Sequence, residues 1–171
     1  MPFTPFHFGP GLALRSLAGE WFSFTVFCFV QVLIDLEPAW YMLQGEAEIH
    51  RFFHTYLGAT LAGVVAVFAG RPVCRWLLRL WNSRLSSAQA RWLGVPETIS
   101  WTAATTGALI GAWSHVFLDS FMHADMEPYS PLGAGNGLLF LIHVDTLYLA
   151  CAAAGALGLG ILLWRRRWRS S

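Results

Sequence analysis

The stretch Ser-His-Val-Phe-Leu-Asp-Ser-Phe-Met-His-Ala-Asp, residues 114–125, follows an apolar run of helix length at 101–113. Its polar groups recur at every fourth residue, so His115, Asp119 and His123 are predicted to lie on one helical face, with neighbouring Cβ atoms about 6 Å apart. Two imidazoles and a carboxylate placed in this way can chelate a metal ion. Such groups at the end of a membrane helix are costly unless they bind something. We therefore expect the rest of the chain to bring further ligands to this face.

The composition is that of a membrane protein. The chain has 171 residues, of which 56% are apolar and only 12% are charged, whereas soluble proteins average about a quarter charged. All of it is interpreted as a single membrane-embedded domain, 1–171. The arginines flank apolar segments rather than covering a soluble face, so no nucleic-acid partner is expected. The three cysteines lie far apart without a CxxC motif, which argues against a disulfide framework, and no cleavable signal peptide is predicted.

The beginning of the chain permits two arrangements. The apolar run at 21–34 is shorter than the ~20 residues needed to cross a bilayer, and Pro38 is expected to end its helix. Either 12–34 forms one spanning helix, or it forms a helical hairpin bent at Gly19. The hairpin would place His7 on the same side of the membrane as Asp35, and the single helix would place it opposite. We slightly favour the hairpin.

The middle of the chain contains a second apolar segment and a basic one. After an acidic loop at 39–49, His50 and His54 open an apolar segment that continues to about Gly70, and their spacing predicts a shared helical face. The segment 71–92 is basic and amphipathic, with tryptophans among its apolar residues. This pattern predicts a helix lying in the membrane interface.

Two further apolar segments complete the chain. The third runs from about 99 to 122 and contains Gly107 and Gly111, a GxxxG pattern typical of close helix contacts, which leaves room for a homodimer. The fourth, 138–164, is long enough to span and ends in an arginine cluster. The predicted fold is therefore an all-α, polytopic integral membrane bundle with about four apolar segments, the first of them a candidate hairpin, and a cytoplasmic interfacial helix.

Charge distribution predicts the orientation. The positive-inside rule places 71–91 and the C-terminal cluster at 165–169 in the cytoplasm of a bacterial-type inner membrane, whereas the side of the N-terminus depends on the hairpin. The ends of all apolar segments that carry histidines and acids then meet at the opposite face. This convergence predicts a site at the extracytoplasmic boundary of the membrane.

The candidate ligands are too many for one tetrahedral ion. They are His7, Asp35, Glu37, His50, His54, His115, Asp119 and His123. A mixed nitrogen and oxygen set suits zinc, or else manganese or iron. The surplus predicts two divalent ions about 3.5–4 Å apart, bridged by a carboxylate such as Asp119 or Asp35 and activating a water molecule.

Three residues are candidates for roles in catalysis. At a helix end broken by Pro38, Asp35 and Glu37 could both turn toward the site, or one could be a ligand while the other orients a histidine. Glu37 or Asp125 is also a candidate to shuttle a proton. Arg51 could hold a phosphate oxygen, although a lipid headgroup would explain it equally well. His143 and Asp145 are weaker candidates for metal ligands, because a satisfied polar pair within a helical bundle would explain them equally well.

The order of these motifs resembles a known family. His7, Asp35-Leu36-Glu37-Pro38, His50-Arg51-Phe52-Phe53-His54-Thr55 and Ser114-His115-xxx-Asp119 resemble the small integral-membrane proteins described as membrane-bound metal-dependent hydrolases. Those proteins carry an Asp-x-Asp turn and an His-Arg-Gly-x-Thr-His-Ser element. This chain has Glu37 for the second Asp, and its two histidines are one residue closer. More distantly, the His-xxx-Asp element is similar to that of zinc phospholipase C.

The resemblance implies a metal hydrolase, and the sequence as a whole leads to the same hypothesis. We expect an enzyme that hydrolyses a lipid or lipid-linked ester or phosphoester at the membrane face. A metal-ion transporter or sensor and a structural metal site are the alternatives. Ligands gathered at one face argue against a transporter, and their surplus argues against a closed structural site.

Overall fold

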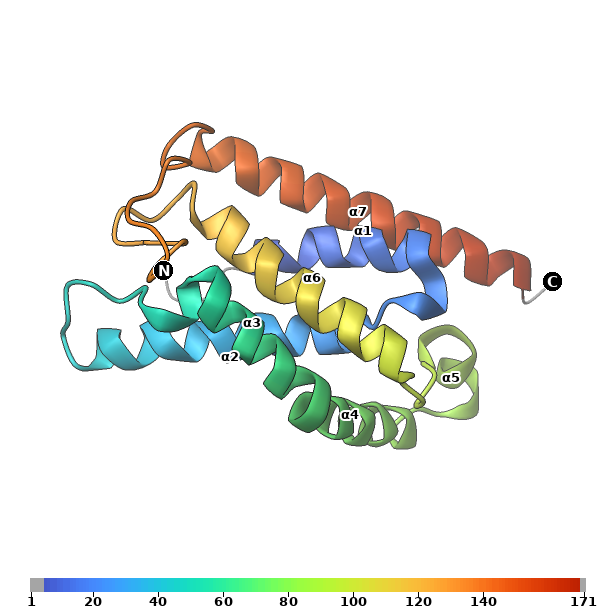
Figure 1. Cartoon of the computed structure of the whole chain (residues 1–171). Helices are drawn as coiled ribbons and strands as arrows, with labels where there is room; N and C mark the ends of the chain where they lie inside the picture. The colour runs from blue at the N-terminus through green and yellow to red at the C-terminus, as the bar shows by residue number, and fades with distance from the viewer. Residues whose placement is uncertain (1–4, 170–171) are drawn as a thin grey trace.

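The computed structural model describes residues 5–169, and every regular element in this range is helical (Figure 1). The α-helices are α1 (Phe8–Ala18), α2 (Phe24–Leu43), α3 (Tyr56–Val65), α4 (Arg71–Ser83), α5 (Ser87–Leu93), α6 (Trp101–Asp119) and α7 (Val144–Arg169). Four short helical segments join them: η1 (Pro5–His7), η2 (Gly19–Trp21), η3 (Phe52–His54) and the π-helical η4 (Ala66–Gly70). The all-α prediction is confirmed for the described residues.

The first apolar segment is a helical hairpin. α1 ends at Gly19, whose φ of 56° lies in the left-handed region that glycine adopts at low cost. After the η2 turn, the Ser23 side chain accepts a hydrogen bond from the Val26 amide and caps α2. The two helices run in opposite directions, so η1 lies at the same end of the molecule as the last turns of α2 (Figure 1). His7 and Asp35 are therefore brought to the same end.

The prediction that Pro38 ends its helix was wrong. Pro38 lies inside α2, which continues to Leu43, so the acidic loop begins only after that residue. A proline in a helix removes one backbone hydrogen bond and bends the helix without necessarily ending it. Apolar helices packed against neighbours tolerate this loss better than isolated helices do. Asp35 and Glu37 therefore lie on a continuous helix rather than at its broken end.

α6 is the central helix, and its small residues allow close packing. A Cβ atom added to Gly107 would lie 2.4 Å from the Ser23 carbonyl oxygen, and one added to Gly111 would lie 3.1 Å from the Phe27 carbonyl oxygen. Both distances are shorter than normal van der Waals contact. The GxxxG pattern thus joins α6 to α2 within the chain, and it offers no exposed surface for a second copy.

Three described helices are long and apolar enough to cross a membrane: Phe24–Leu43, Tyr56–Ser83 and Val144–Trp168. The second is continuous through η4, so α4 extends α3 instead of forming a separate basic helix with α5. Within the most apolar window of Val144–Trp168 only 17% of the residues are buried in the protein. Apolar surface of this extent is typical of a membrane protein. The fourth span and the interfacial position of 71–92 remain predictions.

Apart from Arg51, the arginines whose side chains are described gather at the end of the bundle away from the clustered histidines. Arg165, near the end of α7, donates to the Ser16 carbonyl near the end of α1. Arg71 donates to the Ile99 carbonyl over 2.8 Å, just before α6 begins. The helices thus have one basic end, and η1, the last turns of α2 and the end of α6 lie at the other (Figure 1).

Candidate metal centre

Four buried side chains from three elements meet between the helices. Asp35 comes from α2, His54 from η3, and His115 and Asp119 from α6. The Nε2 atom of His115 is 3.4 Å from Asp35 Oδ1, 3.2 Å from Asp119 Oδ2 and 3.3 Å from His54 Nε2. His54 Nε2 is 3.6 Å from the same Asp119 oxygen. We name these four residues the inner cluster.

The spacing in the inner cluster matches the edges of a ligand tetrahedron. Zinc bonds nitrogen and carboxylate oxygen at about 2.0–2.2 Å, which places neighbouring ligands of a tetrahedral ion about 3.3–3.6 Å apart. The measured separations of 3.2–3.6 Å lie close to this range. One ligand atom from each of the four residues lies within 4.8 Å of all the others. The donor set therefore fits a divalent ion.

The outer nitrogens of both histidines have partners of their own. His115 Nδ1 contacts the buried Oε1 of Gln31, and His54 Nδ1 lies 3.3 Å from Glu37 Oε2. Both partner oxygens can accept a hydrogen bond from an Nδ1–H group, which leaves the Nε2 lone pairs facing the cluster. Metal-binding histidines are typically oriented in this way by an acceptor on the other nitrogen. Sequence reasoning missed Gln31, whose signal was its position four residues before Asp35 on the same face of α2.

Glu37 contacts the inner cluster only through His54. The same Oε2 atom accepts hydrogen bonds from the amides of Phe53, at 2.9 Å, and Arg51, at 3.3 Å. Glu37 thus holds the η3 turn against α2 as well as orienting the imidazole. Of the roles considered for Glu37, the geometry supports that of orienting a histidine.

Replacing Glu37 by glutamine is expected to weaken metal binding by about 10–100-fold without abolishing it, since the change alters a partner of a ligand and not a ligand itself. Glu46→Gln is the matched control, because Glu46 is exposed and pairs only with Arg51 on the surface. Competition with a fluorescent chelator measures both affinities. Equal affinities in the two variants would contradict the orienting role.

The second oxygen of Asp119 faces a different pair of histidines. Asp119 Oδ1 is 3.2 Å from Nε2 of the buried His7 and 3.9 Å from His123 Nε2. Although His7 Nε2 and Asp119 Oδ1 are close, neither atom has a hydrogen-bond partner among the described residues. Buried polar atoms without partners are rare and call for an explanation. A cation between them would satisfy both.

His123 also belongs to a second group, with His50 and Asp125, which we name the outer cluster. His50 Nδ1 lies 2.8 Å from Asp125 Oδ1, and the His50 and His123 rings stack with centroids 3.9 Å apart. Burial alone would raise the pKa of Asp125, but hydrogen bonds from the His50 and Ile49 amides lower it to about 2. Burial lowers the pKa of His123 to about 4. At neutral pH His123 is therefore an uncharged imidazole, the form that binds metals.

Two predictions of shared helical faces need correction. α6 ends at Asp119, so His123 lies in the following turn and only His115 and Asp119 share a helical face. α3 begins at Tyr56 because the Thr55 side chain caps it, accepting from the Gly58 amide over 2.9 Å. His50 and His54 therefore precede α3, and the chain directs His54 to the inner cluster and His50 to the outer one.

Other candidates lie outside both clusters. Arg51 is on the surface, where its guanidinium contacts Glu46 and covers the Tyr41 ring. The structure does not bring this guanidinium to the centre. His143 and Asp145 contact each other at 3.5 Å, and both side chains are largely exposed.

The fold and these side chains define a class: an all-helical protein with three helices long and apolar enough to cross a membrane, and with a buried histidine–aspartate cluster that could hold a metal ion. The chain belongs to the family described as "Domain of unknown function (DUF4184)", whose family pattern matches residues 1–134. This range includes every residue of the inner and outer clusters. No curated protein and no solved structure matches the chain.

Proposed function

We propose that the protein is a membrane-embedded, metal-dependent hydrolase of a lipid or lipid-linked ester or phosphoester. The observation that carries the proposal is the buried Asp119 carboxylate, whose two oxygens face two different sets of histidines. Carboxylates shared in this way are typical of two-metal hydrolytic sites. The nitrogen and oxygen donors suit zinc, with manganese or iron as alternatives.

The two positions differ in how completely the protein surrounds them. The inner cluster supplies four donors, which fill a tetrahedral shell. The second position has three nearby donors, Asp119 Oδ1, His7 Nε2 and His123 Nε2. Catalytic zinc sites keep three protein ligands and one place for water or substrate. Ions held here would polarise the scissile bond and lower the pKa of water.

The outer cluster supplies residues that can move a proton. His50 and Asp125 form a close pair beside His123, and two backbone amides fix the Asp125 carboxylate. Glu37 was the other candidate, and its Oε2 atom likewise accepts from two amides, but the imidazole that it contacts is that of His54 in the inner cluster. We therefore assign the proton shuttle of the second position to the pair of His50 and Asp125 beside His123, with the Asp125 carboxylate holding the His50 imidazole.

A structural metal is the second candidate function, because the four donors of the inner cluster can close a shell without an open position. A transporter is less well supported, since the donors gather toward one end of the bundle. With the basic end in the cytoplasm, this centre would lie toward the opposite face of the membrane.

Metal analysis combined with a hydrolysis assay tests the proposal. Protein purified in detergent is expected to contain about two divalent ions per chain, measured by inductively coupled plasma mass spectrometry. It should hydrolyse nitrophenyl esters or phosphodiesters, lose this activity to a chelator and regain it when zinc or manganese is added. One ion without hydrolysis would support the structural alternative. A chain with no bound metal would contradict both.

A further inference from the structure

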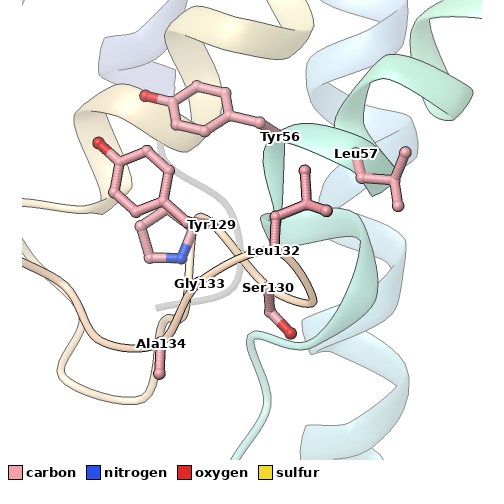
Figure 2. Close-up of a pocket in the computed structure, with 8 residues that line it drawn as sticks. Tyr56, Leu57, Tyr129, Ser130, Leu132, Gly133 and Ala134 are labelled. Atoms are coloured by element: carbon pink, nitrogen blue, oxygen red, sulfur yellow. The ribbon is translucent and has the colours of Figure 1, made fainter.

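A cleft of about 400 Å³ lies between the first turn of α3 and the loop that follows Met126 (Figure 2). It is lined by Tyr56, Leu57, Pro128, Tyr129, Ser130, Leu132, Gly133 and Ala134. The lining side chains are mostly apolar or aromatic, and none is charged. A volume of this size lies within the range of small-molecule sites, and an uncharged lining favours an apolar ligand.

Both walls of the cleft are continuous with the metal centre. Leu57 follows His54 by three residues, and Pro128 follows Asp125 by three. Three residues span at most about 11 Å, so each wall lies within that distance of a cluster residue. The Tyr56 amide donates to the Pro128 carbonyl over 2.9 Å and joins the two walls. A ligand in the cleft would therefore lie beside the centre.

The surroundings of the cleft indicate which ligand it takes. Leu57 begins an exposed apolar stripe along the candidate span Tyr56–Ser83, which includes Leu61 and Phe68. The loop between α6 and α7 also exposes large apolar side chains, with Leu132 93% exposed and Phe140 and Leu141 mostly exposed. Exposing such an apolar surface to water is unfavourable, whereas the acyl chains of a bilayer would cover it. The cleft thus continues a surface that faces lipid.

We infer that this cleft holds an acyl chain of a bilayer lipid and thereby places the lipid's ester groups beside the metal centre. The occupant is a lipid because the apolar lining continues the lipid-facing stripe of α3. The role of the bound lipid as a substrate rests on the proposed function. The binding of the lipid in the cleft does not. The tyrosine and serine hydroxyls of the cleft can contact the polar part of such a ligand.

Photolabelling with a matched pair of variants tests the inference. The probe is a phosphatidylglycerol with a diazirine in one acyl chain, in phosphatidylethanolamine–phosphatidylglycerol vesicles that contain the full chain. Gly133→Phe places a ring in the cleft, where an added Cβ makes ordinary contact with Tyr129. Gly160→Phe is the control, because an added Cβ on this exposed part of α7 meets open space.

Labelled peptides from wild-type protein are expected to map to 56–57 and 128–134. Gly133→Phe should reduce this labelling about tenfold, the effect of excluding about two methylene groups, and Gly160→Phe should leave it unchanged. Equal labelling of the cleft in both variants would overturn the inference, as would the absence of labelled peptides from 56–57 and 128–134 in the wild-type protein. Labelling that persists in Asp119→Ala would support lipid binding even if the hydrolase proposal fails.

Discussion

Replacing Asp119 by alanine is expected to reduce the bound metal from about two ions per chain to none. One carboxylate oxygen lies 3.2 Å from His115 Nε2 in the inner cluster, and the other lies 3.2 Å from His7 Nε2. Removing the side chain therefore takes a donor and a negative charge from both positions at once. Metal content after purification and dialysis is the measurement.

Asp145→Ala is the matched control for Asp119→Ala, since the Asp145 side chain is 87% exposed and belongs to neither cluster. This variant should keep its full metal content. Asp119→Asn preserves the shape of the buried side chain, so comparing its thermal unfolding with that of the alanine variant separates metal loss from misfolding. A folded Asp119 variant that still carries two ions would show that the carboxylate is not shared between metals.

Replacing His7 by alanine is expected to remove one ion and leave the other. Among the described residues, the polar contact of His7 is with the second oxygen of Asp119, and its ring meets His115 edge-on, so the four donors of the inner cluster remain present in the variant. An ion at a two-metal site contributes several kcal/mol of transition-state stabilisation, so hydrolysis should fall by about a hundredfold or more. Metal content and the rate of nitrophenyl ester hydrolysis are measured on the same preparation.

His143→Ala provides the matched histidine control, because this side chain is exposed and pairs only with Asp145. It should retain both the metal and the activity. If His7→Ala keeps two ions, the second position does not depend on this residue. If it keeps one ion and full activity, the catalytic role belongs to the inner cluster alone.

The sequence predicted which helix ends would meet, because charge asymmetry and segment length are properties of long stretches. The spacing of His115 and Asp119 was also informative, since both lie within one regular helix. The hairpin at Gly19 could be only slightly favoured, because an apolar run of about 14 residues fits both arrangements. Its outcome depends on how α1 packs against the rest of the bundle.

The predictions that were wrong concern points where a helix begins or ends. Thr55 caps α3, so the helix begins after His50 and His54. The chain turns after Asp119, so α6 ends before it reaches His123. The four-residue spacing of these histidines therefore did not reflect a shared helix. Pro38 predicted the end of a helix, but α2 continues through it to Leu43. The spacing of Gln31 and Asp35 places both on one face of α2, but it does not reveal the contact of Gln31 with His115, which lies 84 residues away on α6.

α7 contributes no donor to either cluster, and it packs along α1 with most of its apolar surface turned outward. Every donor named here lies before residue 126, and the family match ends at residue 134. All of these donors therefore precede α7 in the chain, yet α7 also packs against η1, where Phe6 stacks on Tyr148 next to His7. The last helix is thus expected to act on the centre through the position of His7 and not by supplying a ligand.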